Sequence, residues 1–255
     1  LLPFPKRQIV NLVVRHVKKL VPAYQLPTAV SFREALTRGQ GLSLKPSAAT
    51  LGDPAFLQYT GGTTGVAKGA TLTHRNVIAN TLQSEAWVQP AMTNPAKGPP
   101  PEQPVFACAL PLYHIFALTC CYLLGMRTGG MNILIPNPRD LPAVVSALKP
   151  WKVTLFPAVN TLYNALAEFP AFRELDFSGL RVSNGGGMAV QAAVAKKWLK
   201  LTGCPICEGY GLSETSPSAT CNPADTDTYS GTIGLPLPST EIAIIDDDRK
   251  PVPIG

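Results

Sequence analysis

One segment of the sequence combines glycine, threonine and lysine as an anion-binding loop does. It reads Tyr-Thr-Gly-Gly-Thr-Thr-Gly-Val-Ala-Lys-Gly-Ala over residues 59–70, after an apolar run over residues 55–59 that is typical of a strand. Glycines let the backbone close around an anion, hydroxyl groups hydrogen-bond to it, and lysine neutralises its charge. The familiar nucleotide loop does not fit, because Lys68 stands between Ala67 and Gly69. We therefore predict a phosphate-binding loop of another kind.

Four further motifs follow along the chain. With the first segment they resemble the signatures of the acyl-adenylate-forming enzymes, in the order which that family shows. The residues of these motifs are most similar to those of bacterial long-chain fatty-acid:CoA ligases, and the resemblance covers essentially the whole chain. The motifs are Leu110-Pro-Leu-Tyr-His114, Asn184-Gly-Gly-Gly-Met188, Glu208-Gly-Tyr-Gly-Leu-Ser-Glu-Thr215 and Gly231-Thr-Ile-Gly-Leu-Pro236.

The resemblance implies that a carboxylic acid is activated with ATP. A thiol cannot usefully attack a carboxylate, because the leaving group would be oxide, so the acid is first converted into acyl-AMP with release of pyrophosphate. Transfer to CoA then gives acyl-CoA. Charge on the transferred phosphate opposes the first step, and a metal ion with fixed hydrogen-bond donors offsets it. The implied partners are ATP, a long-chain fatty acid and CoA, with Mg²⁺ as the cofactor.

The phosphate side of the expected site draws on two motifs. Glu214 is the only acidic residue within its loop, and hard cations favour carboxylate oxygens, so we expect it to bind Mg²⁺. The resemblance adds Thr60 as a second metal ligand. It also implies that Thr60, Thr63, Thr64 and Lys68 hold the β- and γ-phosphates, within a loop that includes Tyr59, Gly61, Gly62 and Gly65.

The adenine side draws on the glycine turn and the tyrosine motif. Gly185, Gly186 and Gly187 would let the backbone approach adenine, with Tyr210 stacking on its face. By resemblance, His114 sits between the acyl carboxylate and the α-phosphate and joins Glu214 and Lys68 as a catalytic residue. Each of these residues has a structural alternative. His114 could be a core histidine, Tyr210 could pack in the core, and the glycines could form only a tight turn. The resemblance lines the rest of the ATP pocket with Glu208, Gly209, Gly211, Leu212 and Ser213.

The sequence departs from the family pattern at two positions. Asn184 replaces a usually smaller residue, and Ala189 replaces a common proline. The family's ribose-binding aspartate, hinge and small C-terminal domain are expected to follow Gly255. We therefore expect residues 1–255 to be a partial N-terminal AMP-binding domain that does not complete acyl-CoA synthesis alone.

Composition indicates a loop-rich chain with limited polar cover. Charged residues make up 15% of the 255 positions, and there are 26 prolines, so we expect part of the surface to face lipid or a missing partner. The net charge of +6 favours anionic partners in general. The six cysteines stand mostly in apolar runs, which indicates reduced, buried thiols in a cytoplasmic protein. Cys204 and Cys207 have metal or redox spacing, but core packing is favoured because no second pair stands nearby.

Alternating patterns predict an α/β fold, with a mostly parallel sheet flanked by helices and ligands at the carboxyl ends of its strands. Residues 6–21 show a basic amphipathic pattern, which predicts either a helix of the domain or a helix that lies on a membrane surface. Residues 90–104 are proline-rich, which predicts a surface loop or a subdomain boundary. Residues 105–126 lack charge, but Pro111 and His114 argue against a membrane span. Strands are expected at 105–110, 132–136, 152–156, 180–183, 205–208 and 241–245, and helices at 31–38, 77–88, 115–125, 140–148, 160–169 and 190–201.

Several functional alternatives stay open from sequence alone. Within the same chemistry they are an aryl- or medium-chain acid ligase and a peptide-synthetase adenylation domain. In another class stands a non-catalytic module that binds nucleotide or a membrane surface. Peripheral contact with the cytoplasmic membrane and a homodimer are further hypotheses. Nucleic-acid binding is disfavoured, because the positive charge is spread along the chain.

Overall fold

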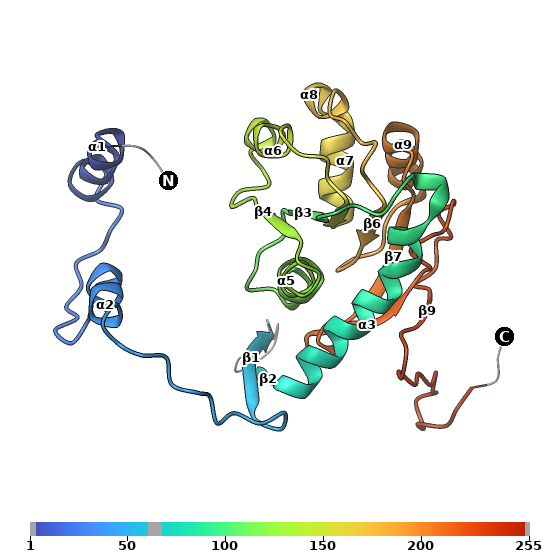
Figure 1. The fold of residues 1–255 in the computed structure, drawn as a ribbon, viewed down its shortest axis with the longest axis horizontal. Coiled ribbons are helices and arrows are strands. Elements are labelled where there is room, and N and C mark those ends of the chain that lie inside the picture. The colour runs from blue at the N-terminus through green and yellow to red at the C-terminus, as the bar shows by residue number, and fades with distance from the viewer. Residues whose placement is uncertain (1–3, 61–67, 253–255) are drawn as a thin grey trace. The chain divides into compact units, whose positions relative to one another are not determined.

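The computed structural model describes residues 4–60 and 68–252, and its chain divides into two compact units (Figure 1). The first unit comprises Leu1–Ala48 and the second Ala49–Gly255. Residues 90–104 lie within the second unit, which also carries all five motifs. The site must therefore be built from the second unit.

Two short helical stretches give the first unit its regular structure. Helix α1 (Lys6–Leu12) continues into the π-helical segment η1 (Val13–Val17), and α2 (Phe32–Gly39) follows. The Ser31 hydroxyl caps α2 by accepting a hydrogen bond from the N–H of Glu34 at 3.2 Å. The helix predicted over residues 6–21 is confirmed as far as Val17, and the one near 31–38 is confirmed. No described residue of this unit is buried, so the apolar sides of its helices are exposed.

A sheet of seven strands forms the centre of the second unit. The strands are β3 (Val105–Cys108), β4 (Met131–Leu134), β5 (Leu155–Ala158), β6 (Val182–Gly185), β7 (Ile206–Gly211), β8 (Ser218–Cys221) and β9 (Leu235–Pro236). They lie in the order β4-β3-β5-β6-β7-β8-β9. The pairings from β4 to β7 are parallel, and those of β7 with β8 and β8 with β9 are antiparallel. The predicted α/β fold with a mostly parallel sheet is confirmed, whereas the two antiparallel strands were not predicted.

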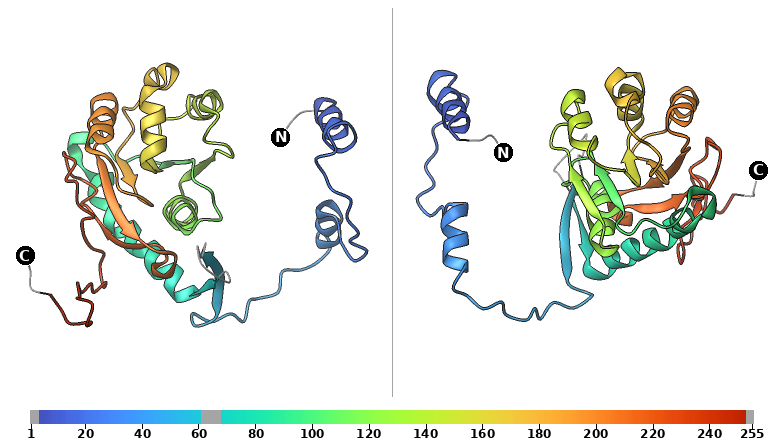
Figure 2. Two further views of the ribbon diagram at one scale, coloured as in Figure 1. Left: turned by 180° about the vertical axis from the view of Figure 1, so that it is seen from behind. Right: turned by 45° about the horizontal axis from the view of Figure 1, so that its top comes forward.

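Helices cover both faces of this sheet. One face carries α6 (Leu141–Leu148), α7 (Asn160–Glu168), α8 (Pro170–Arg173) and α9 (Ala192–Thr202). The other face carries α3 (His74–Thr93) and a continuous helical run made of α4 (Ile115–Ala117), η3 (Leu118–Leu123) and α5 (Leu124–Arg127). Figures 1 and 2 show these two layers with the sheet between them. Among the described residues, no helix is both long and apolar enough to cross a bilayer.

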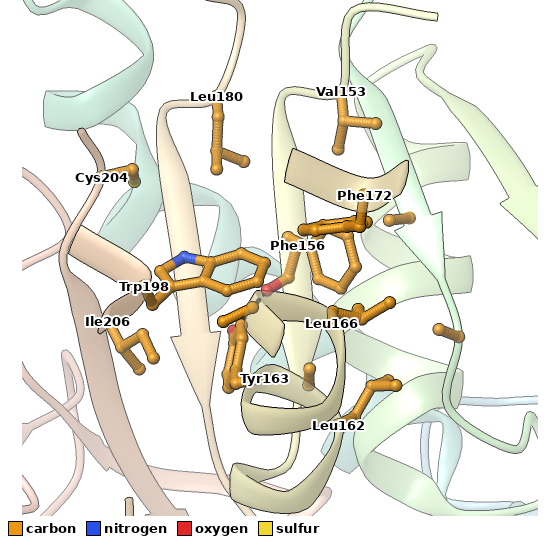
Figure 3. Packing of buried hydrophobic residues seen from close by; sticks show 14 of the residues in the cluster. Val153, Phe156, Leu162, Tyr163, Leu166, Phe172, Leu180, Trp198, Cys204 and Ile206 are labelled. Atoms are coloured by element: carbon orange, nitrogen blue, oxygen red, sulfur yellow. Dashed lines mark hydrogen bonds between the residues drawn. The ribbon is translucent and has the colours of Figure 1, made fainter. Parts of the chain in front are cut away.

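The larger core lies between the sheet and the layer of α6 to α9 (Figure 3). Trp198 is fully buried at its centre, with ring centroids of Tyr163, Phe156 and Phe172 at 4.6, 5.4 and 5.7 Å. Its indole N–H donates to the hydroxyl of Ser183 at 2.9 Å. Such aromatic pairs contribute about 0.5–1.5 kcal/mol each beyond their buried area. This cluster therefore holds β5 and β6 firmly beneath the site.

The opposite core contains the end of α3, which corrects one prediction. The helix continues through Pro90 to Thr93 instead of ending before a loop over residues 90–104. Ala91 and Met92 are buried there, and their carbonyl groups accept hydrogen bonds from the buried guanidinium of Arg181. A proline near the end of a helix removes only one backbone donor. These tertiary contacts outweigh that loss and keep the last turn helical.

A two-stranded antiparallel hairpin precedes α3 and carries the predicted phosphate loop. Its strands are β1 (Pro54–Thr60) and β2 (Lys68–Thr73). Thr73 caps α3, because its hydroxyl accepts from the N–H of Asn76 at 3.2 Å while the Asn76 side chain accepts from the N–H of Thr73 at 3.0 Å. Thr73 is therefore the N-cap residue of α3. Residues 61–67 lie outside the described residues.

The predicted elements differ from the observed ones mainly at their ends. The strand expected at 152–156 begins only at Leu155, and the one expected at 105–110 ends at Cys108. The strand predicted over residues 241–245 is wrong, because only an isolated bridge joins Ile245 to Pro251. Its isoleucines are exposed and pair with no neighbouring strand in the described chain. The acidic run after it forms an exposed turn, closed by the N–H of Asp246 donating to the Lys250 carbonyl at 2.9 Å.

Candidate functional site

A cleft with about 950 Å³ of empty volume opens beside the carboxyl ends of β6 and β7. Four segments far apart in the sequence meet there. They are the Thr60 end of the β1–β2 hairpin, the turn before α4, the glycine turn after β6, and the loop that joins β7 to β8. The predicted site residues that line the cleft are Thr60, His114, Gly186, Gly187, Gly209, Tyr210, Gly211, Leu212, Ser213 and Glu214.

The hairpin presents one hydroxyl to the cleft. Thr60 pairs with Lys68 across the two strands, and its Oγ1 donates to the Lys68 carbonyl at 3.3 Å. Lys68 is exposed and forms no ion pair within the described chain. Tyr59 is 65% exposed and covers Gly69 across the hairpin. Predictions for Gly61, Gly62, Thr63, Thr64 and Gly65 fall outside the described residues.

The loop that carries Glu214 is closed on itself at its base. The N–H of Leu212 donates both to the Thr215 hydroxyl at 2.8 Å and to the Pro217 carbonyl at 3.1 Å. A Cβ on Gly211 would lie 1.8 Å from that carbonyl oxygen, so only glycine allows this closure. The short 3₁₀ helix η4 (Ser213–Thr215) forms the tip, where Glu214 is exposed and lines the cleft.

The donor atoms in the cleft fit a magnesium ion. The Glu214 carboxylate has no hydrogen-bond or ion-pair partner among the described side chains, and the Thr60 hydroxyl lines the same cleft. No group of three or more His, Cys, Asp and Glu residues in the described ranges could hold a metal alone. Magnesium takes one or two protein oxygens and fills its other positions with water and substrate phosphates. One carboxylate beside one hydroxyl matches that pattern.

His114 is the N-cap residue of α4, and its side chain is exposed. Its Nδ1 accepts a hydrogen bond from the N–H of Phe116 at 3.2 Å, so the neutral ring carries its proton on Nε2. The alternative of a buried core histidine is wrong, because the side chain is exposed and lines the cleft. The Nε2 of Gln58 donates to the Tyr113 carbonyl at 2.7 Å and ties this turn to β1. Sequence reasoning missed Gln58, which stood inside an apolar run.

The glycine turn is a tight turn as well as a wall of the cleft. A Cβ on Gly185 would lie 2.7 Å from Val190 and 2.8 Å from Ile206, and Gly187 has a φ of +76°. Gly186 packs on the ring of Phe116. These glycines are therefore required for the close approach and for the backbone conformation. The turn brings main-chain atoms, and no side chain, to this wall of the cleft.

Glu208 lies behind the glycine turn and is only 7% exposed. Its Oε1 accepts a hydrogen bond from the N–H of Val190 at 2.7 Å, and the Tyr229 hydroxyl donates to the Val190 carbonyl. Burial, together with the neighbouring Glu208, raises the pKa of Tyr229 to about 12. Glu208 thus fixes the end of the turn from within the protein, whereas the other predicted residues of its motif line the cleft.

Tyr210 differs from Glu208 in lying at the surface of the cleft. Its side chain is 47% exposed and lines the cleft, so the ring is accessible to a ligand. Gly209 precedes it, and a Cβ there would lie 3.0 Å from the Thr220 carbonyl across the β7–β8 pair. Leu212 and Ser213 continue the same wall. The motif therefore presents an accessible aromatic ring flanked by backbone.

A second, small and apolar cavity adjoins the cleft. Three residues line both spaces: Asn184, Ser218 and Cys221. The Nδ2 of Asn184 donates to the Cys207 carbonyl at 3.3 Å and lies 3.4 Å from the sulfur of Cys221. Sequence reasoning missed this cavity, although the uncharged run over residues 105–126 supplies two of its residues. Its lining includes Trp87, Val88, Cys120, Leu124, Leu155, Val182, Cys207, Ala224 and Leu237.

The cysteines are free, and all are buried except the half-buried Cys120. Cys207 donates to the Ser183 carbonyl at 3.3 Å, inside the sheet. The spacing of Cys204 and Cys207 therefore reflects packing on neighbouring parts of the core. Burial raises the pKa of Cys120 to about 11, so its thiol stays protonated at neutral pH.

The sheet and the cleft define an α/β domain whose ligand site lies at the carboxyl ends of parallel strands. A model of the AMP-binding enzyme family matches residues 6–255. The chain belongs to this family, and the resemblance seen in its motifs is confirmed. The long-chain-fatty-acid–CoA ligase of Escherichia coli O6:H1 is 51% identical over 250 residues, which are 98% of this chain and 43% of that protein. The chain thus spans less than half the length of this curated relative.

Solved structures show the same fold. The anthranilate CoA ligase AuaEII in complex with anthranoyl-AMP aligns with a TM-score of 0.74 and 25% identity, over 97% of this chain and 48% of that one. The O-succinylbenzoate coenzyme A synthetase of Bacillus subtilis, in complex with ATP and magnesium ion, aligns with a TM-score of 0.66 and 25% identity, over 80% and 40%.

Proposed function

We propose that this chain forms the ATP and fatty-acid site of a long-chain fatty-acid:CoA ligase. The observation that carries the proposal is one cleft, lined by Thr60, His114, Tyr210 and Glu214, that shares a wall with an apolar cavity. The polar cleft suits a charged nucleotide, and the apolar residues beside it favour an aliphatic group over a charged one. The identity of about half to a long-chain-fatty-acid–CoA ligase over nearly the whole chain favours the same substrates. The complete enzyme would then pass the acyl group from acyl-AMP to CoA.

The first step joins a carboxylate oxygen of the acid to the α-phosphorus of ATP and breaks the bond to pyrophosphate. Lys68 and Thr60 would hold the departing phosphates, because an ammonium group and a hydroxyl donate to phosphate oxygens. His114 would donate from Nε2 to an oxygen of the carboxylate or α-phosphate and steady the developing charge. Magnesium bound by Glu214 and Thr60 would neutralise charge on the phosphates.

The adenosine part would lie between Tyr210 and the glycine turn. The accessible ring of Tyr210 suits stacking on adenine, and Gly186 and Gly187 leave room for close backbone approach. Glu208 would act by holding this turn in place from behind. These residues bind and orient the nucleotide, so that the α-phosphate meets the carboxylate near His114.

The apolar cavity would favour an aliphatic group of the acid at this end of the cleft. Each methylene group moved from water into such a space contributes about 0.8 kcal/mol. An aminoacyl substrate is disfavoured, because no acidic residue lines this cavity to meet an ammonium group. The 51% identity to a long-chain-fatty-acid–CoA ligase favours a long-chain acid over an aryl or medium-chain acid. We therefore favour a long-chain fatty acid over these alternatives.

Thermal unfolding with increasing Mg·ATP tests the nucleotide site. A ligand that binds only the folded protein stabilises it by about 2.7 kcal/mol at a hundredfold excess over Kd. We expect a rise in Tm for the chain and a smaller rise for Glu214→Ala, with Lys149→Met as a surface control that behaves like the unsubstituted chain. Absence of any rise, or an equal rise in Glu214→Ala, would contradict the proposal. Palmitate added with Mg·ATP should raise Tm further.

We also propose that α1 and η1 contact an anionic membrane surface. Val10 and Val17 of the predicted apolar face are exposed, as are Arg15 and Lys18 of the predicted basic face. Basic amphipathic helices lie on anionic lipid in this way. Sedimentation with vesicles tests it: the chain should pellet with phosphatidylglycerol vesicles more than with phosphatidylcholine vesicles, and Lys18→Glu/Lys19→Glu should abolish the difference. Equal pelleting with both lipids would refute contact with an anionic membrane surface. The homodimer stays a prediction.

A further inference from the structure

The amide of Asn80 pairs with the main chain of a residue 138 positions away. Its Nδ2 donates to the carbonyl of Ser218 at 2.8 Å, and its Oδ1 accepts from the N–H of Ser218 at 3.1 Å. Nδ2 also donates to Oε1 of Gln83 at 3.0 Å. Asn80 is only 3% exposed. One buried side chain thus satisfies both backbone groups of Ser218 and fixes that residue against α3.

Helix α3 is in turn fixed to the strand that carries Lys68. Lys68 begins β2, and Thr73 both ends β2 and caps α3 through its paired hydrogen bonds with Asn76. Leu72 of β2 and Val77 of α3 are buried in one small cluster. Because strand and helix are joined without a loop, the position of Asn80 follows that of Lys68.

Ser218 stands at the base of the loop that carries Glu214. Its neighbour Pro217 closes this loop by accepting a hydrogen bond from the N–H of Leu212 at 3.1 Å. A second buried side chain holds the same base, since the hydroxyl of Thr119 donates to the Ser216 carbonyl at 3.0 Å. The loop is therefore held at residues 216–218, and Glu214 extends from it into the cleft.

We infer that Asn80 is a positioning residue that sets the carboxylate of Glu214 relative to Lys68 and Thr60. The inference rests on the proposed function, in which these groups share the metal and phosphates of Mg·ATP. Asn80 does not line the cleft and so acts through Ser218. Supporting partners of this kind typically change metal affinity by roughly 10–100-fold when they are removed. Substitution of Asn80 should weaken Mg·ATP binding by about tenfold.

Calorimetric titration of the chain with Mg·ATP and with AMP tests this role. AMP lacks the β- and γ-phosphates, so its affinity does not depend on where Glu214 lies. In Asn80→Ala we expect Kd for Mg·ATP to rise about tenfold and Kd for AMP to stay within about twofold. Thr81→Ala is the matched control, because Thr81 is also buried on α3 but donates to the Val77 carbonyl of its own helix. Both affinities should be unchanged in it.

The outcomes separate the two levels of the proposal. An unsubstituted chain that binds neither Mg·ATP nor AMP overturns the proposed function and this inference with it. Normal Mg·ATP binding by Asn80→Ala, or an equal loss of AMP and Mg·ATP affinity, overturns the inference alone. If Asn80→Ala shows no cooperative unfolding, the same pair of titrations on Thr119→Val decides, because valine keeps the size of threonine and removes its hydrogen bond to Ser216.

Discussion

The two sides of the cleft are built in opposite ways. The adenine side, made of β6, β7 and the glycine turn, rests on the buried aromatic cluster around Trp198 and on the buried carboxylate of Glu208. The phosphate side is a two-stranded hairpin outside the main sheet, with Leu57 and Tyr59 largely exposed. Isolated two-stranded hairpins are marginally stable. Substitutions on the first side should therefore reduce stability, whereas those on the second should reduce ligand affinity.

The largest effect is expected for Trp198→Ala. The indole is fully buried and loses both its ring contacts and its hydrogen bond to Ser183. A Trp-to-Ala change in a core costs about 3–5 kcal/mol of unfolding free energy, which denaturant unfolding measures. Trp151→Ala is the control, because that indole is 45% exposed and its loss should cost far less. Similar losses for both variants would break the comparison.

Glu208→Ala should come next. It leaves the buried N–H of Val190 without its partner, which costs about 1–3 kcal/mol. Glu208→Gln is the matched variant, because the amide oxygen can still accept that hydrogen bond. We expect most of the stability to return in Glu208→Gln when unfolding is measured in denaturant. If the glutamine and alanine variants lose equal stability, the hydrogen bond does not hold the turn.

The loss of stability at alkaline pH should report on the neighbouring contact between Tyr229 and Glu208. Tyr229 has its pKa raised to about 12 in the folded protein, against about 10 in an unfolded chain. The folded state then keeps its proton longer, so this contribution is fully present below pH 10 and is lost as pH rises towards 12. Tyr229→Phe should remove this pH dependence in unfolding experiments. A variant that retains it would assign the alkaline loss to other groups.

Lys68→Met should leave the unfolding free energy within about 0.5 kcal/mol, as for most surface substitutions. Its ammonium is exposed and has no ion-pair partner in the described ranges. Stabilisation by Mg·ATP should nevertheless fall, because the charge that meets the phosphates is gone. Thermal unfolding with and without Mg·ATP measures both quantities. A large loss of stability with unchanged nucleotide response would reverse the roles of the two sides.

Gln58→Leu should have the smallest effect on ligand affinity. The substitution removes the hydrogen bond to the Tyr113 carbonyl, which is worth about 0.5–1.5 kcal/mol. It would free the turn before His114 from the hairpin, so binding of a long-chain acid in the presence of Mg·ATP should weaken more than binding of Mg·ATP alone. Fluorescence titration with an acid probe follows this difference. Equal changes in the two affinities would argue against a specific role at the acid side.

Sequence reasoning found the residues of the cleft better than the way they are held. The alternating strands and helices were readable because each buried run is bounded by turn residues, although ends such as that before Leu155 moved by a few positions. The short strands β8 and β9 were not predicted, because they form by pairing with a neighbouring strand and not through a pattern in their own sequences. The apolar cavity escaped for a related reason, since Trp87, Leu155 and Leu237 each read as ordinary core residues.

The buried guanidinium of Arg181 has one more consequence. It is held by the main-chain carbonyls of Met92 at 2.8 Å, Lys97 at 2.9 Å and Gly98 at 3.1 Å, and it forms no ion pair with a described carboxylate. Carbonyl groups do not titrate in water, and a buried contact is screened little by salt. The junction between α3 and β6 should therefore keep its strength in acid and in concentrated salt, where exposed pairs such as Lys197 with Glu168 come apart.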